Sequence, residues 1–227
     1  YVLPERRAEF VRLMREHGMV RNFESQVYRR DGSIIWIAEN ARAVTNTDGM
    51  VQFYEGTVVD ITERKQHDAE LEYQARHDSL TGLPNRSLLR DRIEQAIAKA
   101  GRDGHQVAVV FVDLDHFKLI NDSLGHHVGD RLLLEVSDRL LGCVRGHDSV
   151  ARQGGDEFVI VLTEQRDEDE IIAVVSRLLD AISQPWIDDG QEYGLSCSVG
   201  VSCYPRDGGN PDALLRCADA AMYKAKA

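Results

Sequence analysis

The fold is decided by residues 148–162, which read DSVARQGGDEFVIVL. The second half of this stretch is apolar and β-branched, which is typical of a buried strand, and the first half can extend into a hairpin with it. Gly154 and Gly155 lie between the halves, where glycine allows positive φ angles and lets a ligand approach the backbone closely. The pattern predicts an antiparallel hairpin that carries two carboxylates, Asp156 and Glu157, at its tip.

A second acidic site precedes the hairpin. Residues 107–112, VAVVFV, form a continuous apolar run that predicts a buried central strand, and Asp113-Leu114-Asp115 follows it. Asp113 and Asp156 would then lie on neighbouring strand ends. Mg²⁺ prefers oxygen ligands and commonly joins one or two carboxylates to substrate phosphates, so this pair indicates metal-bound phosphate. The alternative is that these residues are ordinary solvated loop acids.

The composition is that of a globular protein. The chain has 227 residues, of which 43% are hydrophobic, and this is enough for one large or two modest domains. Its apolar runs are too short to span a bilayer, and residues 1–7 lack the features of a signal peptide. The four cysteines form no C-x-x-C pair, which favours buried thiols in a reducing compartment over disulfides or zinc ligands. We therefore expect a cytoplasmic location, although a longer parent protein could be tethered to a membrane.

The charge is unevenly distributed along the chain. Residues 1–66 contain ten basic and ten acidic side chains, so the formal net charge of −11 falls on the remainder. Nucleic-acid binding depends on cationic side chains that displace counterions. The acidic second part argues against nucleic acid as the main partner, and an anionic nucleotide would need metal ions and a few local cations to bind there.

The first part of the chain predicts a helix followed by a small antiparallel meander. Gly18 ends the helical pattern, and the Asp-Gly pairs at residues 31–32 and 48–49 are hairpin signals. The predicted elements are a helix over residues 5–16 and strands over residues 23–30, 34–44 and 51–59.

This first part resembles the C-terminal half of a PAS domain. The resemblance is carried by residues 30–36 (RDGSIIW), 54–57 (YEGT) and, most specifically, 60–65 (DITERK). It implies a partial PAS/PAC-like sensor domain over residues 1–62, whose opening half is absent and whose ligand is unknown. A purely structural dimerising module is the alternative.

A connecting helix is predicted over residues 63–77, which are charged and favour helix. Ile61, Leu71 and Ala75 lie near heptad spacing, but Asp68 interrupts the seam, so we do not expect a stable isolated coiled coil. The helix would either transmit a change in pairing from the first domain or act as a passive linker.

The remainder of the chain predicts an α/β or α+β sandwich. Its predicted elements are a helix capped by Asn85 and ending near Ala100, a strand over 107–112, a helix over 129–144, the hairpin, a helix over 168–182, a strand over 193–204 and a helix over 211–226. An antiparallel hairpin beside strands that are joined through helices indicates a ferredoxin-like sandwich of the polymerase-palm, nucleotidyl-cyclase type.

Residues 76–227 resemble the GGDEF diguanylate cyclases, which implies a cyclase domain over residues 78–227. The motifs that carry the resemblance are residues 77–86 (HDSLTGLPNR), 111–118 (FVDLDHFK), 120–122 (IND), 125–130 (GHHVGD), 154–158 (GGDEF) and 218–226 (ADAAMYKAK). The resemblance implies condensation of two GTP molecules into cyclic di-GMP with release of pyrophosphate, assisted by two Mg²⁺ or Mn²⁺ ions. It also implies a homodimer, because each subunit would hold one GTP.

The resemblance assigns roles to individual residues. Asp113, Asp156 and the Leu114 carbonyl would bind metal, and Glu157 would be either a further ligand or the base that deprotonates the attacking hydroxyl. Asp156 would also be catalytic, and so would Lys118. The positions implied for substrate are Asn121 and Asp130 for guanine, Lys118 and Lys226 for phosphate, and Phe117, Gly154 and Gly155 for contact with the nucleotide. Asn121 could instead be a turn residue, and Asp130 a helix N-terminal acid.

Residues 145–148, RGHD, match the R-x-x-D inhibitory motif of the same family. The match implies that Arg145 and Asp148 bind product away from the active site, with Arg177 as a second contact. A simple Arg–Asp pair within the chain is the alternative. The sequence departs from the family after Lys226, where relatives continue to Gly-Arg-Asn and this chain stops, so a phosphate-binding arginine is missing from a truncated C-terminal end.

The sequence predicts an active diguanylate cyclase. The alternative is a non-catalytic module that binds GTP or cyclic di-GMP, but degenerate relatives usually lose acidic metal ligands, and Asp113, Asp156 and Glu157 are all present here. A third alternative, an adenylyl or other nucleotidyl cyclase, would need a different pair of residues to bind the base.

Overall fold

The computed structural model describes residues 1–226. The chain forms two compact units, Tyr1–Tyr73 and Gln74–Ala227, and the boundary between them falls within the helix α2 (Thr62–Arg76). This helix has no buried residue and is the one predicted over residues 63–77. Among the helices of residues 1–226, none combines the length and the apolar character needed to cross a bilayer.

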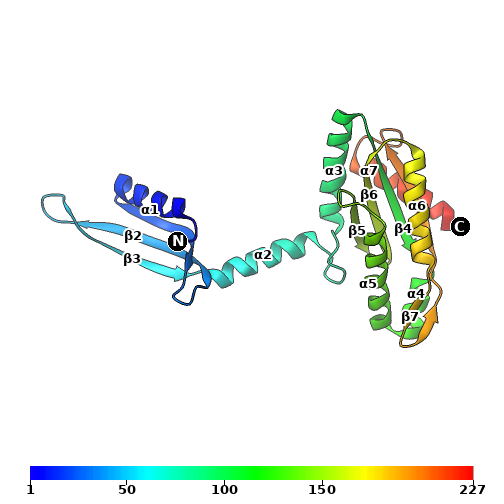
Figure 1. The fold of residues 1–227 in the computed structure, drawn as a ribbon, viewed down its shortest axis with the longest axis horizontal. Coiled ribbons are helices and arrows are strands. Elements are labelled where there is room, and N and C mark those ends of the chain that lie inside the picture. The colour runs from blue at the N-terminus through cyan, green and yellow to red at the C-terminus, as the bar shows by residue number, and fades with distance from the viewer. Residues whose placement is uncertain (227) are drawn as a thin grey trace. The chain divides into compact units, whose positions relative to one another are not determined.

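The first unit is a helix followed by a three-stranded antiparallel sheet (Figure 1). The helix α1 (Pro4–His17) has proline in its first turn and ends at Gly18, which adopts a φ of 68°. The strands lie in the order β1 (Met19–Tyr28), β2 (Ile34–Thr45) and β3 (Val51–Asp60). This arrangement confirms the predicted meander.

The core of the first unit is small. Met14 of α1 packs with Val20 and Phe23 of β1, and few other side chains join them. β3 lies at one edge of the sheet, and all ten of its residues are exposed.

The second unit contains one main sheet, a short hairpin and five helices along residues 86–226. Its elements are α3 (Arg86–Asp103), β4 (Gln106–Leu114), α4 (Phe117–Leu124), α5 (His126–Gly142), β5 (Ser149–Gly154), β6 (Glu157–Gln165), α6 (Glu168–Ser183), β7 (Trp186–Asp188), β8 (Gln191–Tyr193), β9 (Cys197–Tyr204) and α7 (Pro211–Lys226). The main sheet has the order β5-β6-β4-β9, and every neighbouring pair is antiparallel. The predicted α+β sandwich and its hairpin are confirmed.

Helices cover both faces of the main sheet, and β4 lies inside it (Figure 1). Val110 and Val112 face the side covered by α5 and α6, whereas Val109 and Phe111 face the side covered by α3 and α7. Both faces of β4 are therefore buried, which explains why its sequence is continuously apolar rather than alternating.

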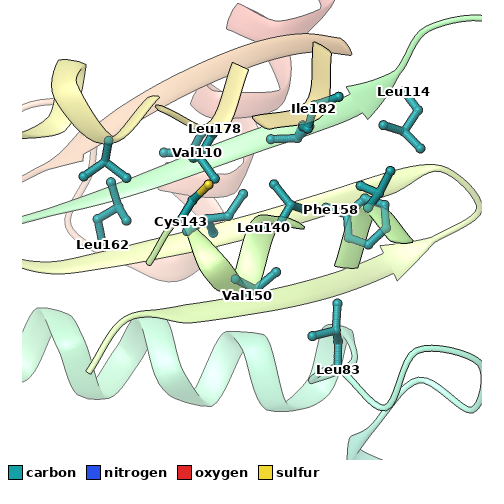
Figure 2. Packing of buried hydrophobic residues seen from close by; sticks show 14 of the residues in the cluster. Leu83, Val110, Leu114, Leu140, Cys143, Val150, Phe158, Leu162, Leu178 and Ile182 are labelled. Atoms are coloured by element: carbon teal, nitrogen blue, oxygen red, sulfur yellow. The ribbon is translucent and has the colours of Figure 1, made fainter. Parts of the chain in front are cut away.

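Figure 2 shows the core on the α5 and α6 side of the sheet. Leu140 of α5 and Leu178 and Ile182 of α6 are almost completely buried among strand residues that include Val110 and Phe158. Phe158 directly follows Glu157, so its burial fixes the start of β6 and with it the position of the Glu157 backbone.

The segment predicted as one strand over residues 193–204 is two strands in different sheets. Tyr193 ends β8, which pairs with β7, whereas Cys197 begins β9, which pairs with β4. The helix predicted over residues 129–144 begins earlier, at His126, and ends at Gly142. The short helix α4 was not predicted, because eight residues offer too little periodicity to identify it.

All four cysteines are free thiols. Cys143 and Cys203 are buried as expected, and Cys197 is half-buried. Cys217 is exposed on α7, so the expectation that every cysteine would be buried is wrong at that position.

Candidate active site

β5 and β6 meet in a tight turn. Gly154 lies opposite Glu157 in the pairing register, so Gly155 and Asp156 form the tip. The φ angles of Gly154 and Gly155 are 150° and 53°, a region that favours glycine. A Cβ atom on either glycine would meet nothing within 4 Å. The turn therefore requires glycine for its backbone angles and leaves open space beside the chain.

Asp113 lies at the carboxyl end of β4, which is the neighbour of β6. It is directly opposite Glu157 in the register, and the Leu114 amide donates a hydrogen bond to the Asp156 carbonyl over 3.3 Å. The Asp113 residue is only 7% exposed, although carboxylates are rarely buried. The structure thus brings Asp113, Asp156 and Glu157 together at one end of the sheet.

Lys226 reaches the same end of the sheet from the last turn of α7. Its Nζ lies 2.5 Å from Asp113 Oδ1, and this hydrogen bond is the main cause that raises the pKa of Lys226. Gly200 of β9 lets α7 approach closely, since a Cβ there would lie 2.1 Å from the Ala218 carbonyl and 2.2 Å from the Met222 amide nitrogen. Close packing of a helix on a strand therefore places a cation beside the carboxylates.

The site carries an excess of negative charge. Burial is the first cause that raises the pKa of Glu157, and Lys226 opposes the shift. The remaining causes are the neighbouring carboxylates Asp113, Asp156 and Asp219. Burial and two nearby carboxylates also raise the pKa of the Cys197 thiol to about 12. One lysine does not neutralise these carboxylates, so the site favours cations.

The oxygen donors at this end of the sheet suit hard divalent cations. The Asp113 and Asp156 carboxylates and the Leu114 carbonyl are of the type that Mg²⁺ and Mn²⁺ prefer. Within residues 1–226, however, no three His, Cys, Asp or Glu side chains gather closely enough to hold a metal ion. Mg²⁺ is usually held by one or two carboxylates together with substrate phosphates and water. The residues fit such a cation if the substrate supplies part of its coordination.

Asn121 of α4 lies against Gly129 of α5. A Cβ on Gly129 would be 2.0 Å from Asn121 Oδ1, so the glycine makes room for the carboxamide. Asn121 Oδ1 is buried and lacks a hydrogen-bond partner within the described residues. Because an unpaired buried acceptor is costly, this oxygen is a candidate acceptor for a hydrogen-bond donor that is not part of the chain. Asp130 follows Gly129 and is exposed, which places a second acceptor nearby.

The other predicted residues of this region have different environments. Phe117 is 8% exposed and belongs to the hydrophobic core, so its side chain anchors α4 rather than lying open to a ligand. Lys118 is exposed on the first turn of α4. The Asp115 carboxylate accepts hydrogen bonds from the Ser196 and Ser198 hydroxyls, both at 2.8 Å, and is therefore directed towards β9.

The R-x-x-D motif lies just before β5, whose far end carries the glycine turn. The Asp148 carboxylate accepts hydrogen bonds from the backbone amides of Arg145 and Thr163, at 3.0 and 2.9 Å. It thus holds the backbone of Arg145 rather than its guanidinium, and the Arg145 side chain is exposed. Arg177 donates to the Cys143 carbonyl at 2.6 and 3.0 Å, which satisfies the end of α5.

Four residues near these sites had no assigned role in the sequence analysis: Asp78, Gly129, Arg152 and Asp219. Asp78, Gly129 and Asp219 lie inside family motifs, and Asp219 precedes Lys226 by seven residues, which is two turns of the same helix face. That spacing could have indicated that Asp219 lies near the carboxylates. No local spacing connects Asp78 to Arg152.

Comparison with known proteins identifies the class. The family described as diguanylate cyclase, GGDEF domain, matches residues 75–227, so the chain belongs to the GGDEF family. The chain is 47% identical over 170 residues to the bifunctional diguanylate cyclase/cyclic di-GMP phosphodiesterase MucR of Pseudomonas aeruginosa. The aligned segment covers 75% of this chain and 25% of MucR. Over 167 residues it is 42% identical to the cyclic di-GMP phosphodiesterase PdeR of Escherichia coli, covering 74% and 25% respectively.

The structure is also similar to that of a sensory box/GGDEF family protein from Caulobacter crescentus. The TM-score is 0.64 at 43% sequence identity, over 66% of this chain and 97% of that chain. This chain therefore spans about a quarter of the length of the two curated relatives and nearly all of the crystallised one. The palm-like cyclase fold of the second unit agrees with this comparison.

Proposed function

We propose that this chain is a diguanylate cyclase, which joins two GTP molecules into cyclic di-GMP and releases pyrophosphate with Mg²⁺ or Mn²⁺ as cofactor. The observation that carries the proposal is the meeting of Asp113, Asp156 and Glu157 at one end of the sheet, beside an open glycine turn. Membership of the GGDEF family and the similarity to a protein named as a cyclase support it.

In the proposed reaction, the 3′-hydroxyl of each GTP attacks the α-phosphate of the other. Two new P–O bonds form, and the two bonds to pyrophosphate break. When bound, the metal would neutralise charge on the phosphates. Glu157 would either take the hydroxyl proton or join the metal ligands. Lys118 and Lys226 would hold phosphate oxygens as point charges, and Gly154 and Gly155 would let the triphosphate approach the backbone.

Guanine recognition is assigned to Asn121 and Asp130. The buried, unpaired Oδ1 of Asn121 would accept a hydrogen bond from the base, and the Asp130 carboxylate would accept from the N1 and N2 groups of guanine. Adenine presents no matching pair of donors. GTP is therefore the proposed substrate, and we expect no nucleic-acid partner.

We propose a cytoplasmic homodimer as the working form, because two GTP-loaded cyclase domains must face each other. Residues 78–227 would form the cyclase domain and residues 1–62 a PAS-like sensor. The three-stranded meander supports the sensor assignment. The helix around residues 63–77 would control the encounter of the two cyclase domains, in response to a ligand that is not identified.

Product feedback is proposed at Arg145, Asp148 and Arg177. Arg145 is exposed, whereas Asp148 already accepts two backbone hydrogen bonds and the Arg177 guanidinium already donates to the Cys143 carbonyl. Arg145→Ala should therefore relieve inhibition by cyclic di-GMP, and the exposed Arg166→Ala should not. Initial rates measured at rising cyclic di-GMP test this, and a wild-type enzyme without product inhibition would contradict the feedback site.

The test of the main proposal is turnover of GTP by the purified chain with Mg²⁺, with the product identified by mass. Asp156→Ala should lower turnover at least about 100-fold, because it removes a group that positions charge in the transition state. Asp138→Ala is the matched control, since Asp138 is exposed on α5 away from this end of the sheet. A folded wild-type dimer that forms no cyclic di-GMP, or an Asp156→Ala variant that keeps forming it, would refute the assignment.

A non-catalytic module that binds GTP or cyclic di-GMP is the second candidate. Two observations favour it: no three metal-binding side chains are gathered within the described residues, and the similar protein PdeR is named only as a phosphodiesterase. Equilibrium binding of GTP without turnover at saturating Mg²⁺ would establish this candidate. Replacing GTP with ATP in the same assay tests the adenylyl-cyclase alternative.

A further inference from the structure

Arg152 lies on β5, two residues before Gly154, and its guanidinium bridges two segments of the chain. One Nη atom donates to Asp78 Oδ1 at 2.8 Å. The Nε and the other Nη atom donate to the Gly155 carbonyl, at 3.0 and 2.8 Å. The side chains of Arg152 and Asp78 are 11% and 20% exposed, so this is not a solvated surface pair. Neither residue belongs to the metal, guanine or product sites described above.

Asp78 is held in place to receive the guanidinium. The same Oδ1 atom accepts hydrogen bonds from the Thr81 amide at 2.9 Å and the Thr81 hydroxyl at 2.7 Å. Burial by itself would raise the pKa of Asp78, but the Thr81 hydrogen bonds and the Arg152 charge outweigh it and lower that pKa. Asp78 is therefore a charged and already oriented partner at neutral pH.

The loop that contains Asp78 is also joined to the end of α2. The Asn85 side-chain amide donates to the Ala75 carbonyl, and the Asn85 backbone amide donates to the Arg76 carbonyl, both at 2.9 Å. The Arg152 backbone amide donates to the Pro84 carbonyl at 3.0 Å. Arg152 thus contacts the loop twice, through its backbone and its side chain, and the loop caps the last turn of α2.

In the glycine turn, the Arg152 guanidinium donates to the carbonyl oxygen of Gly155, which belongs to the peptide group between Gly155 and Asp156. A peptide group is planar, so holding its carbonyl also sets the direction in which Asp156 leaves the turn. Another backbone restraint on the tip is the 3.3 Å hydrogen bond from the Leu114 amide to the Asp156 carbonyl, which is longer than both guanidinium bonds. Gly155 would otherwise be free to rotate, because glycine has few preferred backbone angles.

We propose that Arg152 is a positioning residue for the cyclase reaction, which anchors the glycine turn to the loop after α2 and so holds Asp156 in its reactive orientation. The inference rests on the proposed cyclase function. Displacement of a reacting group by about 1 Å is enough to lower a rate about 100-fold. A turn without its anchor would therefore still bind nucleotide through the guanine site but would present Asp156 poorly.

The experiment compares Arg152→Ala, Arg152→Lys, Asp78→Asn and the double variant Arg152→Ala/Asp78→Asn in the full chain. Arg90→Ala is the matched control, because Arg90 forms a bidentate ion pair with Asp212 on the surface of the same unit. Steady-state kcat and KM for GTP are measured, together with amide hydrogen exchange of residues 154–157 and the Tm of each variant. Hydrogen exchange is recorded without nucleotide or metal, so it does not depend on turnover.

Arg152→Ala and Arg152→Lys should both lower kcat at least about 10-fold while KM changes less than about 3-fold, since lysine has no fork to reach both partners. Exchange of residues 154–157 should accelerate at least about 10-fold in the same variants. The double variant should be no worse than Arg152→Ala alone, because both substitutions break one bridge. Arg90→Ala should change neither kcat nor exchange.

Unchanged kcat and unchanged exchange in Arg152→Lys would overturn the inference, and so would losses that multiply in the double variant. If Arg152→Ala does not fold, Arg152→Lys and Asp78→Asn decide the outcome. If the wild-type chain does not turn over GTP, the proposed function fails, whereas the exchange of residues 154–157 still shows whether Arg152 holds the turn.

Discussion

Gly129 shows how one missing side chain shapes the candidate guanine site. Replacing it with alanine should push the Asn121 carboxamide aside, since the added Cβ would lie 2.0 Å from Oδ1. We expect KM for GTP to rise at least about 10-fold, which corresponds to about 1.4 kcal/mol of lost binding. Gly142→Ala is the control, because it lies in the same helix and its Cβ would meet nothing within 4 Å. GTP affinity of Gly129→Ala equal to that of Gly142→Ala would contradict this prediction.

The Asp78 carboxylate makes stability depend on pH. Its pKa is lowered in the folded chain, so its contribution is present above its ordinary pKa of about 4 and disappears as the pH falls through the lowered value. At pH 7, Asp78→Asn should cost about 1 kcal/mol, or about 2–4 °C in Tm. The difference in Tm between the two proteins should shrink below about pH 4. Thermal unfolding from pH 7 to pH 3 measures it, and Asp138→Asn should show no such change.

Single residues differ in how far the sequence reveals them. Asp113, Asn121 and Asp156 could be selected because each lies in a short motif whose chemistry is evident from residue type. The contact between Asp78 and Arg152 could not be predicted, since 74 positions separate the partners along the chain and only the folded sheet brings them together. The assignment of roles to the motif residues stays a prediction.

Among the elements, α7 and β9 depend on each other through Gly200. Gly200→Ala would drive a methyl group against backbone atoms of α7, which cannot move like a flexible side chain. We expect the free energy of unfolding to fall by about 2 kcal/mol, which is typical of an overpacked core. We also expect the ion pair between Lys226 and Asp113 to weaken, because α7 would be displaced from β9. Urea unfolding measures the loss. Gly194→Ala is the control, since its Cβ would meet nothing within 4 Å, and equal stability of the two variants would contradict the argument.

The long elements of the second unit follow from the sequence, whereas the short ones do not. β4 and β6 are apolar on both faces because helices cover both sides of the sheet, and such runs are easily identified. β7 and β8 have three residues each, so their alternation is too brief to distinguish from a loop. For the same reason Tyr193 was assigned to the strand that in fact begins at Cys197.

At the scale of the whole chain, each unit contains one of the two tryptophans. Trp36 lies in the first unit and Trp186 in the second. The first unit has the smaller core, so we expect it to unfold at a lower urea concentration. Fluorescence of Trp186→Phe would then report an earlier transition than fluorescence of Trp36→Phe. Superimposable curves would show that the units unfold together.

The division into two parts could be predicted from the sequence, since the charge balance and the motif types change near residue 66. The place where the units separate could not be fixed, because α2 is one continuous helix without a buried residue and no break in its pattern marks the boundary. The GGDEF family match starts at residue 75, close to that boundary.

The exposed strand β3 has a practical consequence for handling this protein. Its backbone presents a row of unused amide and carbonyl groups along the edge of the sheet, and Phe53, Tyr54 and Val58 are all more than half exposed. Exposed apolar edge strands of this kind can pair with extended segments of other chains. Concentrated solutions are therefore expected to turn cloudy through sheet-to-sheet association before either core melts.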